Sequence, residues 1–326
     1  MNFTGFISAW WNERHRMEIR TFGATNRNVS LIGFGSAPIG LLATEQKAVA
    51  EVLNTLLDHG VNLIDTAAMY LGAEEAIGRA VAHRRDEYVL VSKCGQSYPG
   101  LEGEPWSAKL ITQTVDRALR RLKTDRLDVM LLHSCDLETL KKGEALEALV
   151  EARRAGKIRF AGYSGDNEAV NFAAGLNDVA VVETSVNVCD QANLDTLLPA
   201  ARRRNLGVIA KRPLANAAWK DLSAQPGFYA EYAATYTERL AKMNVRPVDL
   251  GFDGDPAQVW PEIALRFTLA QPGVHTAVVG TTNLDHALEN VRIAEKGPLA
   301  DDAVLRLRDA FRRAEAESGE KWLAQT

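Results

Sequence analysis

The most constraining feature of this sequence is a repeated alternation of short apolar runs with amphipathic segments. Eight apolar runs end in a polar residue or a glycine: Leu31–Gly35, Val61–Asp65, Tyr88–Lys93, Leu127–His133, Arg159–Tyr163, Val179–Glu183, Leu206–Lys211 and His275–Gly280. Most of them are continuously apolar, as parallel strands buried on both faces must be. Eight strand–helix units over roughly 250 residues predict an α/β fold, a (β/α)₈ barrel.

The segments between these runs have helical periodicity. One apolar stripe, with spacings of three and four residues, consists of Val49, Val52, Leu53, Leu56 and Leu57. Ser107 is placed to cap the helix that follows it. Gly156 and Gly207 follow two further helical segments, at the place where a left-handed residue commonly ends a helix.

A doubly wound open sheet is the structural rival, and the first apolar run argues against it. Such a sheet usually carries a G-x-G-x-x-G turn after its first strand. Here the corresponding segment is Gly33-Phe34-Gly35-Ser36-Ala37-Pro38, which lacks the third glycine and has a proline where an early helix would begin.

Two segments depart from the strand–helix rhythm. Glu18–Phe22 and Arg27–Ser30 flank a short polar turn and predict a β-hairpin that could plug the bottom of the barrel. Residues 212–256 form a long, aromatic-rich connection after the seventh strand, and connections of this length are usually functional or ordered in themselves. We expect residues 1–16 to be an N-terminal extension and residues 17–326 to form a single barrel domain.

Composition excludes several classes of protein. The net charge of −4 and the absence of a basic stripe argue against nucleic-acid binding. No apolar stretch is long enough to span a membrane, and the first sixteen residues lack the apolar core of a signal peptide. The three scattered cysteines, Cys94, Cys135 and Cys189, suggest neither disulfides nor a metal site and suit the cytoplasm. They are either small buried residues or a redox-sensitive rim of the site.

Polar residues follow the ends of successive strands, where barrel enzymes place their chemistry. The second, third and fourth runs end in Asp65, Lys93 and His133, and Tyr70 follows Asp65 by five residues. Taken singly, Asp65 could cap a helix and His133 could be a hydrogen-bonded core residue. A lysine at the end of an apolar run needs a carboxylate partner or a function. Their joint placement favours an active site.

Three motifs in this chain resemble the aldo-keto reductase superfamily. They are Asp65-Thr66-Ala67-Ala68-Met69-Tyr70 followed by Glu74 or Glu75 and Gly78, then Val91-Ser92-Lys93, and then Leu131-Leu132-His133. The resemblance runs from Met17 to about Ala294. It implies an NAD(P)H-dependent oxidoreductase that reduces an aldehyde or ketone to an alcohol, or catalyses the reverse oxidation.

The resemblance also assigns roles to the catalytic residues. Tyr70 donates the proton to the carbonyl oxygen, and Lys93 lowers the phenol's pKa because a nearby ammonium favours the phenolate. Asp65 keeps Lys93 charged and oriented, and His133 orients the carbonyl by hydrogen bonding.

The same resemblance implies a nucleotide site and a small-molecule carbonyl substrate, with no metal. The resemblance favours NADP(H). NAD(H) is also compatible, because Thr282 and His286 stand where many members have Arg or Lys for the 2′-phosphate. The expected cofactor residues are Gly35, Ser36, Ser164, Asn187, Lys211, Arg212, Pro213, Leu214, Gly280, Thr282, His286, Glu289 and Asn290. Two departures are Gly165 in place of the family's usual Asn and Asn187 in place of the commoner Gln. Arg212 stands where many members stack an aromatic ring, which a guanidinium can replace.

The substrate and the competing functions are less defined by the sequence. We expect Trp106 and Trp219 to line the substrate pocket. One alternative is a weakly catalytic barrel that uses bound nucleotide as a regulatory signal. Another is a lyase in which Lys93 forms a Schiff base, which would need a neutral amine. The sequence does not predict an oligomeric state.

Overall fold

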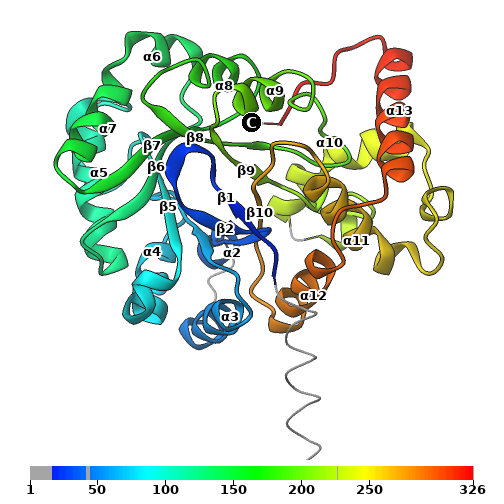
Figure 1. Ribbon diagram of the computed structural model, residues 1–326, viewed down its shortest axis with the longest axis horizontal. Helices are drawn as coiled ribbons and strands as arrows, with labels where there is room; N and C mark the ends of the chain where they lie inside the picture. The colour runs from blue at the N-terminus through cyan, green and yellow to red at the C-terminus, as the bar shows by residue number, and fades with distance from the viewer. Residues whose placement is uncertain (1–16, 42–44, 226, 326) are drawn as a thin grey trace, which may run out of the picture.

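The structure is a computed structural model that describes residues 17–41, 45–225 and 227–325, so the predicted extension 1–16 lies outside the described residues. Its centre is a closed barrel of eight parallel strands in the order β10-β3-β4-β5-β6-β7-β8-β9 (Figure 1). The strands are β3 Ile32–Gly35, β4 Leu63–Asp65, β5 Val89–Cys94, β6 Leu127–His133, β7 Ile158–Ser164, β8 Val179–Ser185, β9 Gly207–Lys211 and β10 Thr276–Val279. The predicted (β/α)₈ barrel is therefore confirmed, with every strand end within two residues of its predicted position.

Helices surround the barrel and bury their apolar stripes against it (Figure 1). The α-helices are α2 Ala37–Leu41, α3 Gln46–Asp58, α4 Ala73–Val81, α5 Ala108–Leu122, α6 Leu137–Lys142, α7 Glu144–Arg154, α8 Asn167–Ala173, α9 Leu197–Arg203, α10 Gly227–Met243, α11 Pro256–Leu269, α12 Leu284–Glu295 and α13 Asp301–Ser318. Short 3₁₀ helices are η1 Gly23–Thr25, η2 Ala82–Glu87, η3 Ala215–Ala217, η4 Leu222–Ala224 and η5 Pro247–Leu250. Ser107 caps α5 as predicted, since its Oγ accepts a hydrogen bond from the Leu110 N–H.

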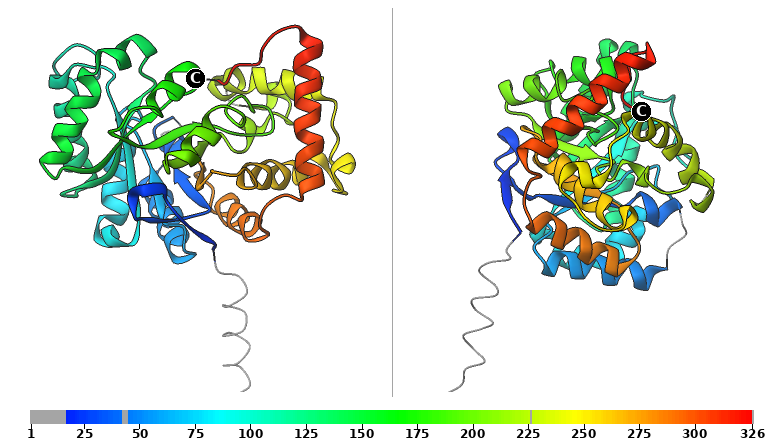
Figure 2. Two further views of the ribbon diagram at one scale, coloured as in Figure 1. Left: turned by 45° about the horizontal axis from the view of Figure 1, so that its top comes forward. Right: turned by 90° about the vertical axis from the view of Figure 1, so that its right-hand side faces the viewer.

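The predicted hairpin closes one end of the barrel. Strands β1 Ile19–Thr21 and β2 Asn28–Ser30 pair antiparallel, and the hairpin lies at the left edge of the right-hand view in Figure 2. Phe22 and Val29 join an apolar cluster with side chains from inside the barrel, such as Leu63 and Val129. The chemistry must therefore lie at the opposite, open end.

The predicted glycine cap at Gly207 is wrong, whereas the one at Gly156 is confirmed by its φ of 73°. Gly207 is the first residue of β9, and the left-handed residue after α9 is Asn205, with φ of 53°. Gly207 has a packing role instead. A Cβ there would lie 2.8 Å from Cε2 of Phe22, so glycine leaves room for the aromatic ring that plugs the barrel.

The long connection after β9 is ordered within the described ranges. It contains α10 and the 3₁₀ helices η3, η4 and η5, and α10 packs beside α13 (Figure 1). The three cysteines are buried free thiols. None of the helices in the described ranges is long and apolar enough to cross a membrane.

Candidate active site

The four predicted catalytic residues come from neighbouring strands at the open end of the barrel. Asp65 ends β4, Lys93 lies in β5, His133 ends β6, and Tyr70 lies between β4 and α4. Lys93 is almost fully buried, and its Nζ donates to both carboxylate oxygens of Asp65 at 2.5 and 2.6 Å and to the Thr66 carbonyl at 3.2 Å. A buried ammonium held by two oxygens of one carboxylate has a fixed position and a fixed charge.

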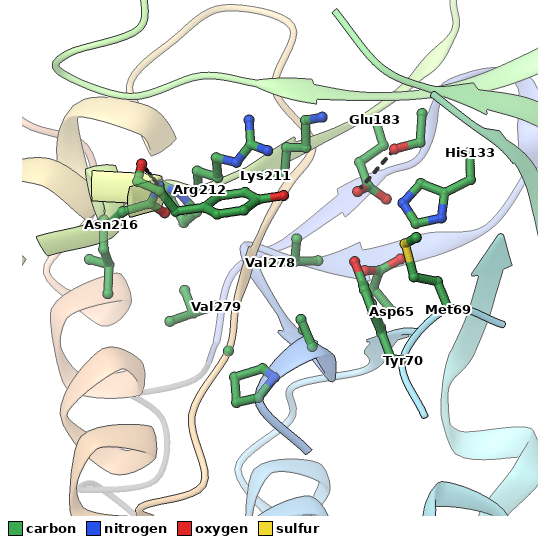
Figure 3. Close-up of a pocket in the computed structure, with 18 of the residues that line it drawn as sticks. Asp65, Met69, Tyr70, His133, Glu183, Lys211, Arg212, Asn216, Val278 and Val279 are labelled. Atoms are coloured by element: carbon green, nitrogen blue, oxygen red, sulfur yellow. Dashed lines mark hydrogen bonds between the residues drawn. The ribbon is translucent and has the colours of Figure 1, made fainter. Parts of the chain in front are cut away.

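Tyr70 and His133 complete one wall of a cavity of about 730 Å³ (Figure 3). Their rings are perpendicular, with centroids 6.1 Å apart, and the Lys93 Nζ lies 5.6 Å from the Tyr70 ring centroid. Asp65, Tyr70 and His133 all line this cavity. The three side chains point toward a shared space that could hold a carbonyl group.

Burial and charge set the protonation states of these groups. Burial alone would lower the pKa of Lys93, but the carboxylates of Asp65 and Glu183 outweigh it and raise that pKa above its ordinary value. Burial, followed by the nearby cations Lys93, Lys211 and Arg212, holds the pKa of His133 well below its ordinary value. At neutral pH the site therefore contains an ammonium and a neutral imidazole.

Tyr70 differs from the sequence expectation. We expected Lys93 to lower the pKa of this phenol, and its charge does act in that direction. Burial has the larger effect, however, and the net result is a Tyr70 pKa above its ordinary value. The phenol is thus protonated at neutral pH, which is the form that a proton donor needs.

Glu183 is a site residue that the sequence analysis missed. In the barrel register, Ser164 of β7 pairs with His133 on one side and with Glu183 on the other, so the three share one layer. The Glu183 Oε2 lies 3.2 Å from the Lys93 Nζ, and its Oε1 accepts a hydrogen bond of 3.3 Å from Ser164 Oγ. The sequence does contain a signal for it, because Glu183 is a carboxylate at the end of an apolar run, as Asp65 is.

The strand β9 side of the cavity carries the remaining positive charges. Lys211 forms an ion pair of 2.9 Å with the buried Asp166. The Arg212 guanidinium carbon lies 5.4 Å from the ring centroid of Tyr232 on α10, and Arg212 also donates to Ser185 Oγ and to the Gln325 carbonyl. Lys211 and Arg212 line this side of the cavity (Figure 3), and Pro213 and Leu214 continue the lining.

All of the predicted cofactor residues except Asn187 divide into three groups. Those that line the cavity are Gly35, Ser164, Lys211, Arg212, Pro213, Leu214 and Gly280. Ser36 is buried directly after Gly35, and its Oγ has no hydrogen-bond partner among the described residues. Beyond the cavity lining, on the loop after β10 and on α12, lie Thr282, His286, Glu289 and Asn290.

Asn187 does not face the cavity as expected. It is fully buried beyond the end of β8, where its Oδ1 accepts a hydrogen bond from the Cys189 N–H and its backbone pairs with Asp190. The residue of this segment that reaches the cavity is Glu183, four positions earlier, because the strand register directs its side chain inward.

Trp106 and Trp219 also lie elsewhere than expected, since neither lines the cavity. The Trp106 ring covers Gly95, where a Cβ would lie 2.0 Å from the ring. Trp219 stacks on Trp260 of α11, with centroids 6.1 Å apart and planes 11° from parallel. Met69 and Tyr232 are among the large side chains that line the cavity instead.

Other motif residues support the site through packing. Glu74 is buried and accepts a hydrogen bond of 3.0 Å from Ser92 Oγ, and Arg121 forms ion pairs with both Glu74 and Glu75, at 3.7 and 2.8 Å. A Cβ on Gly78 would lie 2.2 Å from the Arg121 carbonyl oxygen, so this glycine lets α4 and α5 approach closely. A Cβ at Gly165 would lie 2.5 Å from the Tyr163 hydroxyl, which explains the missing asparagine side chain.

Comparisons with known proteins identify the family and agree with the fold. Residues 31–311 match the aldo/keto reductase family. L-galactose dehydrogenase of Arabidopsis thaliana is 26% identical over 300 residues, covering 85% of this chain and 88% of that protein. A Klebsiella pneumoniae aldo-keto reductase in complex with NADPH is 27% identical, with a TM-score of 0.68, covering 90% of this chain and 95% of its own. A Bacillus halodurans aldo-keto reductase in its holo form supports the fold, with a TM-score of 0.73 at 24% identity and coverage of 90% and 96%.

Because the family match spans most of the sequence, this chain belongs to the aldo/keto reductase family. It is an enzyme of the oxidoreductase class, like the curated relatives that match most of its length. The described residues contain no group of three or more His, Cys, Asp and Glu side chains arranged to hold a metal ion.

Proposed function

We propose that this enzyme interconverts a small carbonyl compound and its alcohol with NADP(H) as hydride carrier. The observation that carries the proposal is the buried Lys93–Asp65 ion pair beside Tyr70, with Tyr70 and His133 facing the same cavity. Carbonyl reduction requires proton donation to oxygen and hydride delivery to carbon. The catalytic tetrad of Asp65, Tyr70, Lys93 and His133 meets the first requirement.

Each residue of the tetrad has a separate role in the proposal. Tyr70 donates its phenolic proton to the carbonyl oxygen, and the Lys93 ammonium stabilises the phenolate that remains. Asp65 holds Lys93 in place through two hydrogen bonds. Neutral His133 donates a ring N–H to the same carbonyl oxygen and so fixes its direction. In alcohol oxidation, Tyr70 accepts the proton in return.

The cavity fits a nicotinamide nucleotide in size and in polar groups. Its volume lies within the range of roughly 300–1,000 Å³ typical of small-molecule sites. Ser164 and Glu183 offer polar atoms to the nicotinamide end, and the unpartnered Ser36 Oγ lies directly after Gly35 of the lining. When bound, the nicotinamide supplies the hydride. The Klebsiella relative holds NADPH, which supports NADP(H), while NAD(H) remains compatible with Thr282 and His286.

The lining also favours a small carbonyl substrate. Apolar side chains at the cavity include Met69, Leu214, Tyr232 and Val278. They suit a compact aldehyde, ketone or sugar-derived compound, and the name of the Arabidopsis relative points to a sugar. A Schiff-base lyase is not favoured, because the Lys93 ammonium already contacts Asp65, Thr66 and Glu183 and its raised pKa keeps it charged.

A cofactor titration tests the proposal. The purified protein is titrated separately with NADPH and NADH while its tryptophan fluorescence is followed. We expect saturable quenching, with NADPH binding more tightly. If neither nucleotide bound at millimolar concentration, the proposal would be wrong, and borohydride trapping of a substrate adduct on Lys93 would test the lyase instead.

A further inference from the structure

The active site places two buried carboxylates around one ammonium. Lys93 lies 2.5 Å from Asp65 Oδ1 and 3.2 Å from Glu183 Oε2, and both acidic side chains are about 4% exposed. Asp65 alone balances the charge of Lys93. Glu183 therefore contributes a carboxylate that the proton-donating role of Tyr70 does not require.

The other charged groups at the cavity do not neutralise Glu183. Lys211 is paired with Asp166 at 2.9 Å, and His133 is neutral because burial lowers its pKa. Arg212 carries a positive charge, but its guanidinium lies against Tyr232 on the β9 side, away from Glu183 and His133 (Figure 3). When both carboxyl groups are ionised, the charge immediately around Lys93 is negative on balance. Burial, followed by the charge of Glu183, accordingly raises the pKa of Asp65 well above its ordinary value.

Glu183 also borders the place where hydride transfer must occur. The carbonyl carbon that receives hydride is bonded to the oxygen that Tyr70 protonates, so the nicotinamide ring must lie close to Tyr70. Glu183 faces the same part of the cavity as Tyr70 and His133 (Figure 3). Its place in the layer of His133 and Ser164 is fixed by the strand register.

We propose that Glu183 makes this enzyme select the oxidised form of its nicotinamide cofactor. The oxidised nicotinamide ring is positively charged and the reduced ring is neutral, so a nearby carboxylate in a poorly solvated site attracts only the oxidised form. This inference rests on the proposed function and deepens it. The Glu183 carboxylate biases the enzyme toward alcohol oxidation, because the free enzyme then binds more of the oxidised cofactor that this direction consumes.

The test compares affinities rather than turnover. Dissociation constants for NADP⁺ and NADPH are measured by fluorescence titration for the wild type and for Glu183→Gln. Glutamine has the same shape and still accepts the Ser164 hydrogen bond, so only the charge is removed. The matched control is Glu317→Gln, the same change at an exposed position of α13.

The inference predicts that Glu183→Gln weakens NADP⁺ relative to NADPH by about tenfold or more, and that Glu317→Gln leaves the ratio unchanged. In the wild type, NADP⁺ should bind at least as tightly as NADPH. Tighter NADPH binding by the wild type would overturn the inference even if the variant did not fold. An unchanged affinity ratio in a folded Glu183→Gln would also overturn the inference, but it would leave the proposed function intact. If neither NADP⁺ nor NADPH bound the wild type, the inference and the proposed function would both be wrong.

Discussion

The two sides of the barrel mouth are built in different ways. On the β4–β8 side, Asp65, Lys93, His133 and Glu183 are strand residues with neighbours in register. On the β9–α10 side, the cavity is lined by residues that follow the end of β9 and by Tyr232 of α10. On the β4–β8 side, the hydrogen-bonded strands of the barrel hold the cavity side chains in place. On the β9–α10 side, the long connection after β9 holds them.

Backbone conformation sharpens this contrast. Arg212, Ala215, Asn216 and Ala217 all have positive φ, between 44° and 56°. Left-handed backbone costs a non-glycine residue about 1–2 kcal/mol. A segment that tolerates such strain beside the cavity is positioned by packing against α10, and not by the backbone conformations that its residues favour. The comparison indicates that the strands hold the chemistry and that the β9–α10 segment shapes the space around it.

The largest expected effect comes from removing the central cation of the strand side. Lys93→Met leaves Asp65 and Glu183 buried without their shared cation, which should cost about 3–5 kcal/mol of unfolding free energy. Turnover should fall by about 10²–10⁴-fold, because Tyr70 loses the group that stabilises its phenolate. Urea unfolding and steady-state rates measure the two effects.

The matched control for this prediction is Lys109→Met, at an exposed lysine paired with Glu102. Its stability should stay within about 0.5 kcal/mol of the wild type. If Lys93→Met and Lys109→Met had equal stability, the buried ion pair would not be the anchor of the strand side.

A second prediction concerns pH and His133. Its folded pKa lies well below that of the unfolded chain, so protonation favours unfolding, and the stability it contributes is full above pH 6.5 and is lost as the pH falls below that value. The loss is at most about 1.4 kcal/mol per pH unit. Between pH 7.5 and 5.5, unfolding free energy should therefore fall less steeply in His133→Gln than in the wild type. Parallel curves would contradict the burial of a neutral imidazole.

The smallest effect tests the strained side through two adjacent alanines. Ala217 has φ of 55°, whereas Ala218 has φ of −53° and is buried. Ala217→Gly relieves the strain of a left-handed backbone, and this gain roughly offsets the greater conformational entropy of the unfolded chain. The stability of this variant should therefore remain within about 0.5 kcal/mol of the wild type. Ala218→Gly gains no such relief and should lose about 1–2 kcal/mol. Equal losses in thermal unfolding would argue against strain at this segment.

The strand side could be predicted from the sequence because it depends on local patterns. Continuous apolar runs identified the eight strands, and an ionisable residue at the end of such a run marked Asp65, Lys93 and His133. Glu183 carries the same signal at the end of its run. Which residue of this segment faces the cavity depends on the strand register, which directs Glu183 inward, whereas Asn187 bonds the Cys189 N–H instead. Gly207 was likewise misassigned, because its contact is with Phe22, far away in the sequence.

The β9–α10 side could not be predicted in the same way. Its aromatic content was visible, but which aromatic residue reaches the cavity depends on how α10 packs against the barrel. Trp219 stacks on Trp260, while Tyr232 meets Arg212. At Tyr70 the sequence predicted the direction in which Lys93 shifts the pKa, but the larger, opposite effect of burial depends on three-dimensional packing.

The most direct test of the account is the single change Tyr70→Phe, which removes one hydroxyl group. Carbonyl reduction is followed by NADPH absorbance, and NADPH affinity is measured on the same preparation by fluorescence titration. The account predicts that turnover falls by about 10²–10⁴-fold while the dissociation constant for NADPH stays within about twofold. Retained turnover in a variant that still binds NADPH would show that Tyr70 is not the proton donor.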